Sequence, residues 1–491
     1  MGINLKKIKL AGRMVWPLIE GGKGIALTTG KTSGAWAAED CIGTFSAASP
    51  DMLDKDGKVL PYKFHGKTRQ ERQKEIVEQS IKGGIAQAKL AREISGDKGA
   101  VFMNVLWEMG ACEEILEGIL DGCDGSIDAV SSGAGMPFKL AEICAKRGVY
   151  YNPIVSSVRA FKLLWKRGFK EYGDYFGGVI YEDPWKAGGH NGLSNSEDPQ
   201  IHQDPYDRIV EIRKYMNEIG LNNNPIIIAG GVWNLTDWEK YIDNPEVGPV
   251  AFQFGTRPLL TQESPLADEI KRKFFTLKKG DIRLQKYSPT GFWSSAVNNA
   301  FMQELELQSK IVLPFSKEID EEKGFVVPVP SIGGLVGKLL HKAVDKVEGK
   351  LGENVEKIKG VVFLTEKDAE VYDKFIEEGF DHIVTLPDSQ LMFVKQDTFK
   401  RIRQDQKDCV GCLSGCMFSG WSQREGLLIK PDARSFCIRK SLSAVAHESN
   451  PNDWLLFSGH SGYRFAQDEF YQGGNFIPTT KELIEQIKKG K

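Results

Sequence analysis

His190 stands in the setting that best suits catalysis. It lies within Lys186-Ala-Gly-Gly-His-Asn-Gly192, directly after Gly188 and Gly189. Because glycines leave little side-chain crowding, we expect the imidazole to reach into a cavity and to titrate near neutrality. A histidine so placed could remove a proton from an acidic carbon or orient a bound anion. The alternative is that His190 contacts a bound cofactor and moves no proton.

Two glycine-containing turns carry the groups that bind phosphate. Gly230-Gly231 directly follows the apolar run Pro225–Ala229, and Gly255-Thr256 follows Pro249–Phe254. A glycine pair lets backbone N–H groups approach a phosphate without an intervening Cβ, and the threonine adds a hydroxyl. Together the two turns predict a phosphorylated cofactor.

A cluster of cysteines indicates a second kind of site. Cys409, Cys412 and Cys416 lie close together and are followed by Cys437, whereas the other cysteines are scattered through the first third of the chain. Four thiolates brought together from this spacing could hold a [4Fe–4S] cluster or a zinc ion. Unliganded thiols in a reducing compartment are the alternative.

The elements that must position these residues alternate along the first part of the chain. Short apolar runs followed by amphipathic stretches are typical of β-α units around a parallel sheet. We expect helices at Gln70–Ile94, Pro137–Lys146, Ser157–Arg167, Pro205–Ile219 and Thr236–Tyr241, with Ser156 and Asp204 capping the third and fourth. Eight strands are expected, the number a closed barrel requires: Pro17–Ile19, Gly43–Ser46, Ala100–Val105, Ala129–Ser131, Val149–Pro153, Gly178–Tyr181, Pro225–Ala229 and Pro249–Phe254.

The places of the unusual residues favour a (β/α)8 TIM barrel over an open doubly wound sheet. They recur where predicted strands end: Gly21-Gly22, Asn104, Ser131–Gly133, Gly230-Gly231 and Gly255-Thr256. In a parallel barrel the carboxyl ends of all strands form one binding face. We therefore predict an α/β barrel with its site on that face.

The composition limits the class of partner. With 64 basic and 66 acidic residues the net charge is -2, so the charge balance does not indicate nucleic acid. No stretch approaches the length of a membrane span, and the amino terminus lacks an apolar segment with a cleavage site. We expect a cytoplasmic protein with a small-molecule substrate. The sequence leaves open whether the chain forms a homo-oligomer or meets an electron-transfer partner.

The pattern changes after residue 310. We predict a barrel over residues 1–310, an α/β insertion over 311–405, a cysteine segment over 406–440 and a return to the barrel with a closing helix over 441–491. The expected elements of the insertion are helices at Leu335–Glu356 and Glu366–Gly379 and strands at Gly360–Leu364 and Asp381–Leu386.

These motifs resemble, in the same order, those of the nitronate monooxygenase (2-nitropropane dioxygenase) family and its relatives, the FMN-dependent enoyl-acyl carrier protein reductases. An ordered set is more specific than any single member. The matching runs are Pro17–Gly22, Phe102–Val105, Ser131–Pro137, Lys186–Gly192, Pro225–Val232, Phe252–Arg257, Thr261–Ser264 and Ser288–Gly291.

The resemblance implies a site for FMN. The residues that would lie against the flavin ring are Gly21, Gly22 and Asn104, and those that would hold the phosphate are Gly230, Gly231, Gly255 and Thr256. The remaining members of the predicted site are Gly188, Gly189, Ser132 and Gln253. Lys23 stands where the family usually has Met, and a lysine there could favour an anionic substrate or stabilise reduced flavin.

The resemblance also implies oxidation of nitronates or nitroalkanes with dioxygen, with FMN as the redox group. One alternative is an NAD(P)H-dependent flavin reductase of quinones or enoyl thioesters. Another is an FMN/iron–sulfur electron-transfer subunit of a larger complex. A flavin enzyme has a use for a one-electron relay, which favours the [4Fe–4S] cluster over zinc at the cysteines.

Overall fold

The computed structural model describes the chain except for residues 1–2, 4, 319–321, 329–360, 381 and 423–429. The chain divides into two compact units. The barrel unit comprises Met1–Phe301, Val410–Ser414 and Ile438–Lys491, and the second unit comprises Met302–Cys409 and Gly415–Cys437. The helix expected at Leu335–Glu356 lies outside the described residues.

The eight expected strands form a closed parallel barrel. Each pairs with its neighbours along the chain, and the last pairs with the first. The prediction of a (β/α)8 barrel is therefore confirmed. The strands are β3 (Leu18–Glu20), β4 (Ile42–Ser46), β7 (Ala100–Leu106), β8 (Ala129–Gly133), β9 (Tyr150–Val155), β10 (Val179–Glu182), β12 (Ile226–Ala229) and β13 (Val250–Phe254).

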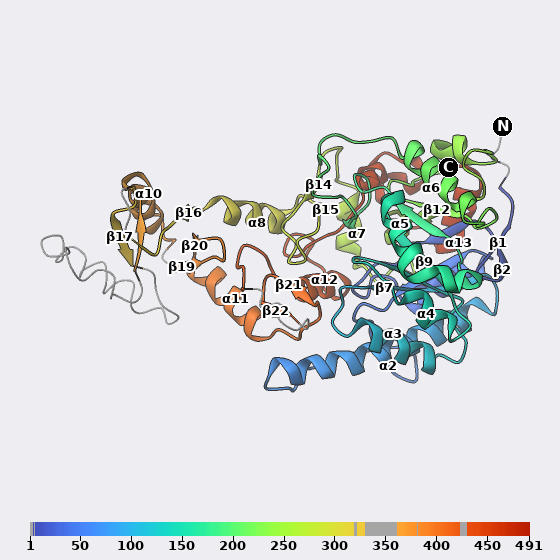
Figure 1. Cartoon of the computed structure of the whole chain (residues 1–491), viewed down its shortest axis with the longest axis horizontal. Coiled ribbons are helices and arrows are strands. Elements are labelled where there is room, and N and C mark those ends of the chain that lie inside the picture. Colours follow the sequence, from blue (N-terminus) through green and yellow to red (C-terminus); the bar gives the residue numbers. More distant parts are fainter. Residues whose placement is uncertain (1–2, 4, 319–321, 329–360, 381, 423–429) are drawn as a thin grey trace, which may run out of the picture. The chain divides into compact units, whose positions relative to one another are not determined.

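Helices surround these strands (Figure 1). They are α1 (Gly30–Ala38), α2 (Arg69–Ser95), α3 (Cys112–Gly122), α4 (Leu140–Ala145), α5 (Val158–Leu164), α6 (Pro205–Glu218) and α7 (Asp268–Phe274). The stretch Thr236–Tyr241 is a short 3-10 helix. The sequence reading missed α1, which is buried on several faces and so lacks an amphipathic stripe.

One of the two expected helix caps is wrong. Asp204 caps α6 as predicted, since its side chain accepts from the N–H of Tyr206. At α5 the cap is Ser157, whose hydroxyl accepts from the N–H of Ala160. Ser156 instead donates its hydroxyl to the carbonyl oxygen of Gly192, at 2.7 Å.

The barrel interior is filled by alternate residues of the strands. Phe102, Ile180, Ile227 and Ala251 belong to one buried cluster inside the barrel. The hairpin of β1 (Ile8–Leu10) and β2 (Arg13–Val15) adds apolar side chains to the same cluster. Because strand side chains alternate between faces, the residue two positions after each of these cluster members also points inward and lies nearer the carboxyl end of its strand.

Further elements extend the barrel unit beyond its strands and outer helices. A small antiparallel sheet joins β11 (Gly189–His190), β15 (Ser294–Val297) and β14 (Ile282–Gln285). From later in the chain come α12 (Ile438–His447) and α13 (Thr480–Lys488). A two-stranded ribbon of β5 (Met52–Leu53) and β6 (Val59–Leu60) precedes α2.

The second unit has a separate apolar core. The helix α8 (Ala300–Lys310) leads into it, and an antiparallel sheet follows in the order β16 (Val312–Pro314), β20 (Gln390–Val394), β19 (His382–Thr385). The strand β17 (Phe325–Pro328) pairs with β18 (Val361–Leu364). The remaining elements are α10 (Glu366–Glu377), α11 (Gln396–Lys407), β21 (Gly415–Cys416) and β22 (Trp421–Ser422). The strands and the helix expected at residues 360–386 are present as β18, α10 and β19.

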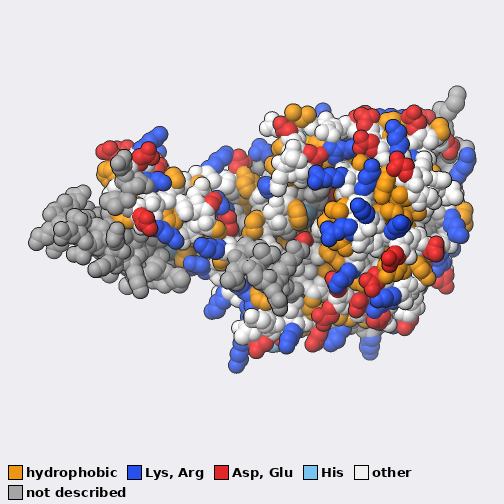
Figure 2. Space-filling view, viewed as in Figure 1, with side chains coloured by type: hydrophobic (Ala, Val, Ile, Leu, Met, Phe, Trp, Pro, Cys, Tyr) orange, Lys and Arg blue, Asp and Glu red, His pale blue; other side chains and the backbone are white. Residues whose placement is uncertain are grey.

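Charges of both signs are interspersed over the surface of the barrel unit on the face that Figure 2 shows. This mixture agrees with the near balance of basic and acidic residues in the sequence. Within the parts of the chain that the structure describes, no helix is both long and apolar enough to cross a membrane.

Candidate functional site

A cavity of about 250 Å³ lies at the carboxyl ends of the barrel strands. Its volume lies just below the roughly 300–1,000 Å³ that ligand sites span. Three polar side chains lie on its floor, Asn104, Glu182 and Gln253. Each stands two residues after a member of the interior cluster, so the register of the barrel directs all three inward.

The structure brings nearly all of the predicted site residues to this cavity. Its lining includes His190 and the predicted cofactor residues Gly21, Gly22, Lys23, Asn104, Gly188, Gly189, Gly230, Gly231, Gln253, Gly255 and Thr256. Ser132 is the exception. It is fully buried and follows Val130 on the outward face of β8, so Gly133 lines the cavity in its place.

Close approaches explain why glycines occupy several of these positions. A Cβ on Gly22 would lie 2.4 Å from the Cβ of Asn104. Gly230 has a φ of +87°, and a Cβ there would lie 2.8 Å from the carbonyl oxygen of Asp183. A Cβ on Gly255 would meet nothing within 4 Å. Side chains at the first two positions would therefore displace the strand tips, whereas the space beside Gly255 stays open.

One end of the cavity carries the donors that suit a phosphate group. The turns Gly230-Gly231 and Gly255-Thr256 follow β12 and β13, where TIM barrels often bind phosphate. The N–H of Gly459 donates to the Thr256 hydroxyl oxygen at 2.9 Å, which leaves the hydroxyl proton free to donate to another acceptor. Lys186 lines the cavity beside Gly231 and adds a positive charge.

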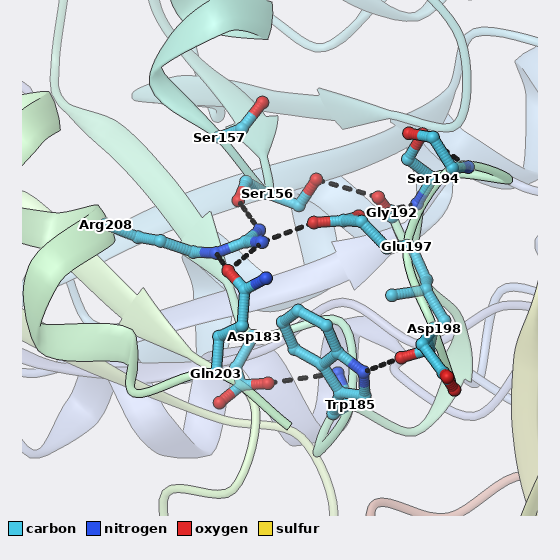
Figure 3. Close-up of polar contacts among 12 residues, drawn as sticks. Ser156, Ser157, Asp183, Trp185, Gly192, Ser194, Glu197, Asp198, Gln203 and Arg208 are labelled. Carbon is cyan, nitrogen blue, oxygen red and sulfur yellow. Dashed lines mark hydrogen bonds and ion pairs between the residues drawn. The ribbon is translucent and has the colours of Figure 1, made fainter. Parts of the chain in front are cut away.

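The loop that carries His190 is held by Arg208 of α6 (Figure 3). The guanidinium donates to the carbonyl oxygen of Ser156 at 2.8 Å and to the side chain of Gln203 at 2.7 Å, and it forms an ion pair with Glu197. It also lies 4.8 Å from the ring centroid of Trp185, whose indole N–H donates to Asp198. These contacts fix both sides of the loop between β10 and α6.

His190 lies at a strand position within the cavity wall. Its Nε2 is 2.6 Å from the Ser288 hydroxyl, which is 2.8 Å from the Thr290 hydroxyl. The ring of Phe457 packs edge-on at 5.2 Å between centroids. The expected titration near neutrality is wrong, because burial lowers the pKa of His190 to about 4. The imidazole is therefore neutral at pH 7.

A buried ion pair closes the turn after β3. The Lys23 ammonium donates to the carbonyl oxygen of Gly21 at 2.7 Å and lies 3.4 Å from Glu20 Oε1. Burial raises the pKa of Glu20 to about 7, although Lys23 opposes the shift. Burial likewise lowers the pKa of Lys23. The Lys23 ammonium is therefore held within its own turn, between the carbonyl of Gly21 and the Glu20 carboxyl group.

Segments far along the chain complete the cavity wall. Leu413 pairs with Met109 in the loop after β7, and the N–H of Gly110 donates to the carbonyl oxygen of Cys412 at 3.0 Å. Both residues of the later segment line the cavity, together with Leu442 of α12. The sequence reading missed this wall, because contacts between distant segments leave no local pattern.

The comparison with protein families identifies the family of the chain. A family model described as nitronate monooxygenase matches residues 112–374, which is more than half of the chain. The chain belongs to the nitronate monooxygenase family. It is an enzyme, an FMN-dependent oxidoreductase. No match was found among curated proteins.

Solved structures similar to this nitronate monooxygenase family member include enzymes of more than one kind. FabK from Thermotoga maritima is 18% identical, with a TM-score of 0.39 over 60% of this chain and 74% of that chain. The nitroalkane oxidase from Streptomyces ansochromogenes is 16% identical, with a TM-score of 0.43 over 59% and 78%. The enoyl reductase domain of MlnA from Bacillus amyloliquefaciens is 12% identical, with a TM-score of 0.47 over 97% and 93%.

Glu182 also lines the cavity of this family member, and the sequence reading missed it. Burial raises its pKa to about 8, and the neighbouring Asp183 adds to the shift. A signal for it was present. A carboxylate that ends the apolar run Val179-Ile180-Tyr181, in register with an inward-facing isoleucine, stands where a barrel strand meets its ligand.

The cysteine centre stays a prediction for this enzyme. Cys412 belongs to the barrel unit, whereas Cys409, Cys416 and Cys437 belong to the second unit. Among the described residues, no group of three or more His, Cys, Asp or Glu side chains is arranged to hold a metal ion. Analysis of the purified protein for iron, sulfide and zinc tests the prediction, and a protein free of all three would exclude it.

Proposed function

We propose that this enzyme oxidises nitronates, the anions of nitroalkanes, with FMN as the redox group and dioxygen as the electron acceptor. When bound, FMN takes up the electrons of the substrate and passes them to dioxygen. The observation that carries the proposal is a neutral histidine, His190, on the same cavity as two glycine turns whose donors suit a phosphate group.

The residues present fit FMN. The phosphate would be held by Gly230, Gly231, Gly255 and Thr256, with Lys186 offsetting its charge. At the floor, Gly21 and Gly22 pack closely against Gln253 and Asn104, and the two glycines place no side chain of their own in the cavity. Such a surface suits an aromatic ring system, and the amide groups supply hydrogen-bonding partners at its edge.

The state of His190 favours a nitronate over the neutral nitroalkane as substrate. An imidazole with a pKa of about 4 is a weak base, so it is poorly suited to removing a proton from carbon at neutral pH. A neutral imidazole still donates through one nitrogen and accepts through the other. With Ser288 holding Nε2, the ring is oriented to bind an anion that arrives already deprotonated.

The walls of the cavity would keep water from the reacting carbon. Leu106, Met109, Leu413 and Phe457 present apolar side chains to the same space as His190. An apolar wall strengthens the hydrogen bonds made inside it, since water no longer competes for the same groups. The cavity therefore suits a small organic anion with its charged end near His190.

Anaerobic reduction of the bound flavin tests the proposal. The FMN-loaded enzyme is mixed without oxygen with an alkyl nitronate, the parent nitroalkane, NADH and NADPH in separate samples, and the flavin absorbance is followed. We expect rapid bleaching by the nitronate and slower bleaching by the nitroalkane at neutral pH. Rapid bleaching by NADH or NADPH alone would contradict the proposal and indicate a flavin reductase of quinones or enoyl thioesters.

A further inference from the structure

Glu182 occupies a central place on the cavity floor that the proposed chemistry does not use. It ends β10 and lines the cavity. The register pairs it with Ala229 of β12, and on the other side Ile154 of β9 lines the floor. A carboxyl group thus faces the cavity between apolar neighbours.

In the part of the chain that the structure describes, no positive charge holds this carboxyl group in its ionised form. On β12 the register partner of Glu182 is Ala229, and on β9 Ile154 pairs with Ile180, two residues before Glu182. Ala229 pairs in turn with Gln253 of β13, which brings an uncharged amide to the same level of the floor. The charged neighbour that shifts the pKa of Glu182 is Asp183, which has the same sign. The other titratable groups on the cavity wall are Lys23, Glu108, Lys186, His190, Cys412 and Arg439. Lys23 faces Glu20, and Lys186 lies 3.4 Å from Asp183.

Burial therefore leaves Glu182 protonated at neutral pH, since its pKa rises to about 8. A protonated carboxyl group has an O–H donor and a carbonyl acceptor side by side. That pair is complementary to a cyclic imide edge, where a ring carbonyl adjoins a ring N–H. An ionised carboxylate would accept from the N–H but would repel the carbonyl oxygen.

We propose that Glu182 recognises the pyrimidine edge of the flavin as a carboxylic acid, donating its O–H to a ring carbonyl and accepting from the ring N–H. The inference rests on the proposed function, because it takes FMN as the ligand of the cavity. It explains why a polar group is kept on an otherwise apolar part of the floor, since burial without a partner is unfavourable. The contact is to the ring and does not involve the phosphate.

The experiment measures the dissociation constants of FMN and riboflavin between pH 6 and pH 9, by quenching of flavin fluorescence. The wild type is compared with Glu182→Gln, which keeps a donor and an acceptor at every pH, and with Glu182→Leu. The control is Glu114→Gln, the same chemical change at an exposed position on α3.

We expect the affinity of the wild type to fall about tenfold between pH 7 and pH 9, as the acid ionises in the free protein. Glu182→Gln should bind both flavins with little dependence on pH, and Glu182→Leu should bind both about tenfold more weakly at pH 7. Glu114→Gln should follow the wild type. Riboflavin should respond as FMN does, because the two share the ring.

A Glu182→Gln variant that loses affinity with pH as the wild type does would overturn the inference, and so would full affinity in Glu182→Leu. If the leucine variant does not fold, the pH profile of Glu182→Gln decides alone. A wild type that binds neither flavin at any pH would overturn the proposed cofactor as well. Failure of the Glu182 inference alone would instead leave flavin binding intact and unaffected by the Glu182 substitutions.

Discussion

Two kinds of group line the cavity: backbone turns and ionisable side chains. The turns at Gly230, Gly231 and Gly255 supply backbone N–H donors, whose state does not change with pH. The other kind consists of ionisable side chains, including His190 and Glu182, whose pKa values burial has moved by large amounts.

This difference separates groups whose state is independent of pH from groups whose state depends on their surroundings. Backbone donors need only the correct loop path, and glycine supplies that path at positions where any side chain would collide. Ionisable groups need a local environment as well, because burial decides which protonation state they adopt. Changes at the glycine turns should therefore alter the affinity for FMN at every pH. Changes at the ionisable side chains should alter the rate, in the case of His190, or the pH dependence of flavin affinity, in the case of Glu182.

The largest expected effect lies at the Gly230-Gly231 turn. Gly230→Ala places a Cβ 2.8 Å from the carbonyl oxygen of Asp183 at a φ of +87°, so the turn must move. We expect the affinity for FMN to fall by about 100-fold or more. The matched control is Gly220→Ala, which has a φ of +83° and nothing within 4 Å of its Cβ. Fluorescence titration with FMN measures both variants, and equal losses in the two would contradict this account.

At His190 we expect a loss of rate, of about the same size as the loss of FMN affinity in Gly230→Ala, and no loss of cofactor. His190→Ala should lower kcat/KM for a nitronate by roughly 100-fold, because the anion loses its oriented hydrogen-bonding partner. The FMN content of the variant should match that of the wild type. Steady-state oxygen consumption and the flavin spectrum measure the two quantities. A variant that loses its flavin would place His190 in cofactor binding instead.

The pH profile distinguishes a buried histidine from an exposed one. The pKa of His190 is lowered from its ordinary 6.5 to about 4, so the neutral form persists as the pH falls through 6.5. We expect the protonation of His190 to leave the rate of nitronate oxidation unchanged from pH 8 to about pH 5. The rate should fall only toward pH 4. A decline centred near pH 6.5 that disappears in His190→Ala would refute the burial argument.

The smallest effect is expected at the loop that carries His190. Arg208→Ala removes the contacts to Ser156, Glu197 and Gln203 while leaving every cavity residue in place. We expect kcat to fall by about fivefold through misplacement of the imidazole, with unchanged affinity for FMN. Arg159→Ala, at an exposed position on α5, is the control and should match the wild type. An unchanged kcat in Arg208→Ala would show that the loop keeps its path without the arginine.

The barrel was predictable because its signals are local. Each strand is a short apolar run, and the glycine turns that follow β12 and β13 stand directly beside those runs in the sequence. The direction in which a strand residue faces was harder to predict. Ser132 and Glu182 both lie at strand ends, and only the register of the closed barrel shows that the serine faces outward and the glutamate inward.

Long-range packing accounts for the rest of what the sequence did not reveal. The lowered pKa of His190 depends on burial by Phe457 and its surroundings, which come from more than 250 residues later in the chain. The wall formed by Cys412 and Leu413 likewise depends on a distant segment pairing with the loop after β7. Neither feature has a local pattern from which it could be predicted.

The most direct test of the central claim is the visible spectrum of the purified protein after incubation with FMN and removal of the unbound flavin. The account predicts one FMN per chain in the wild type and almost none in Gly230→Ala. A wild-type protein that emerges colourless, or a Gly230→Ala variant that retains as much flavin as the wild type, would contradict it.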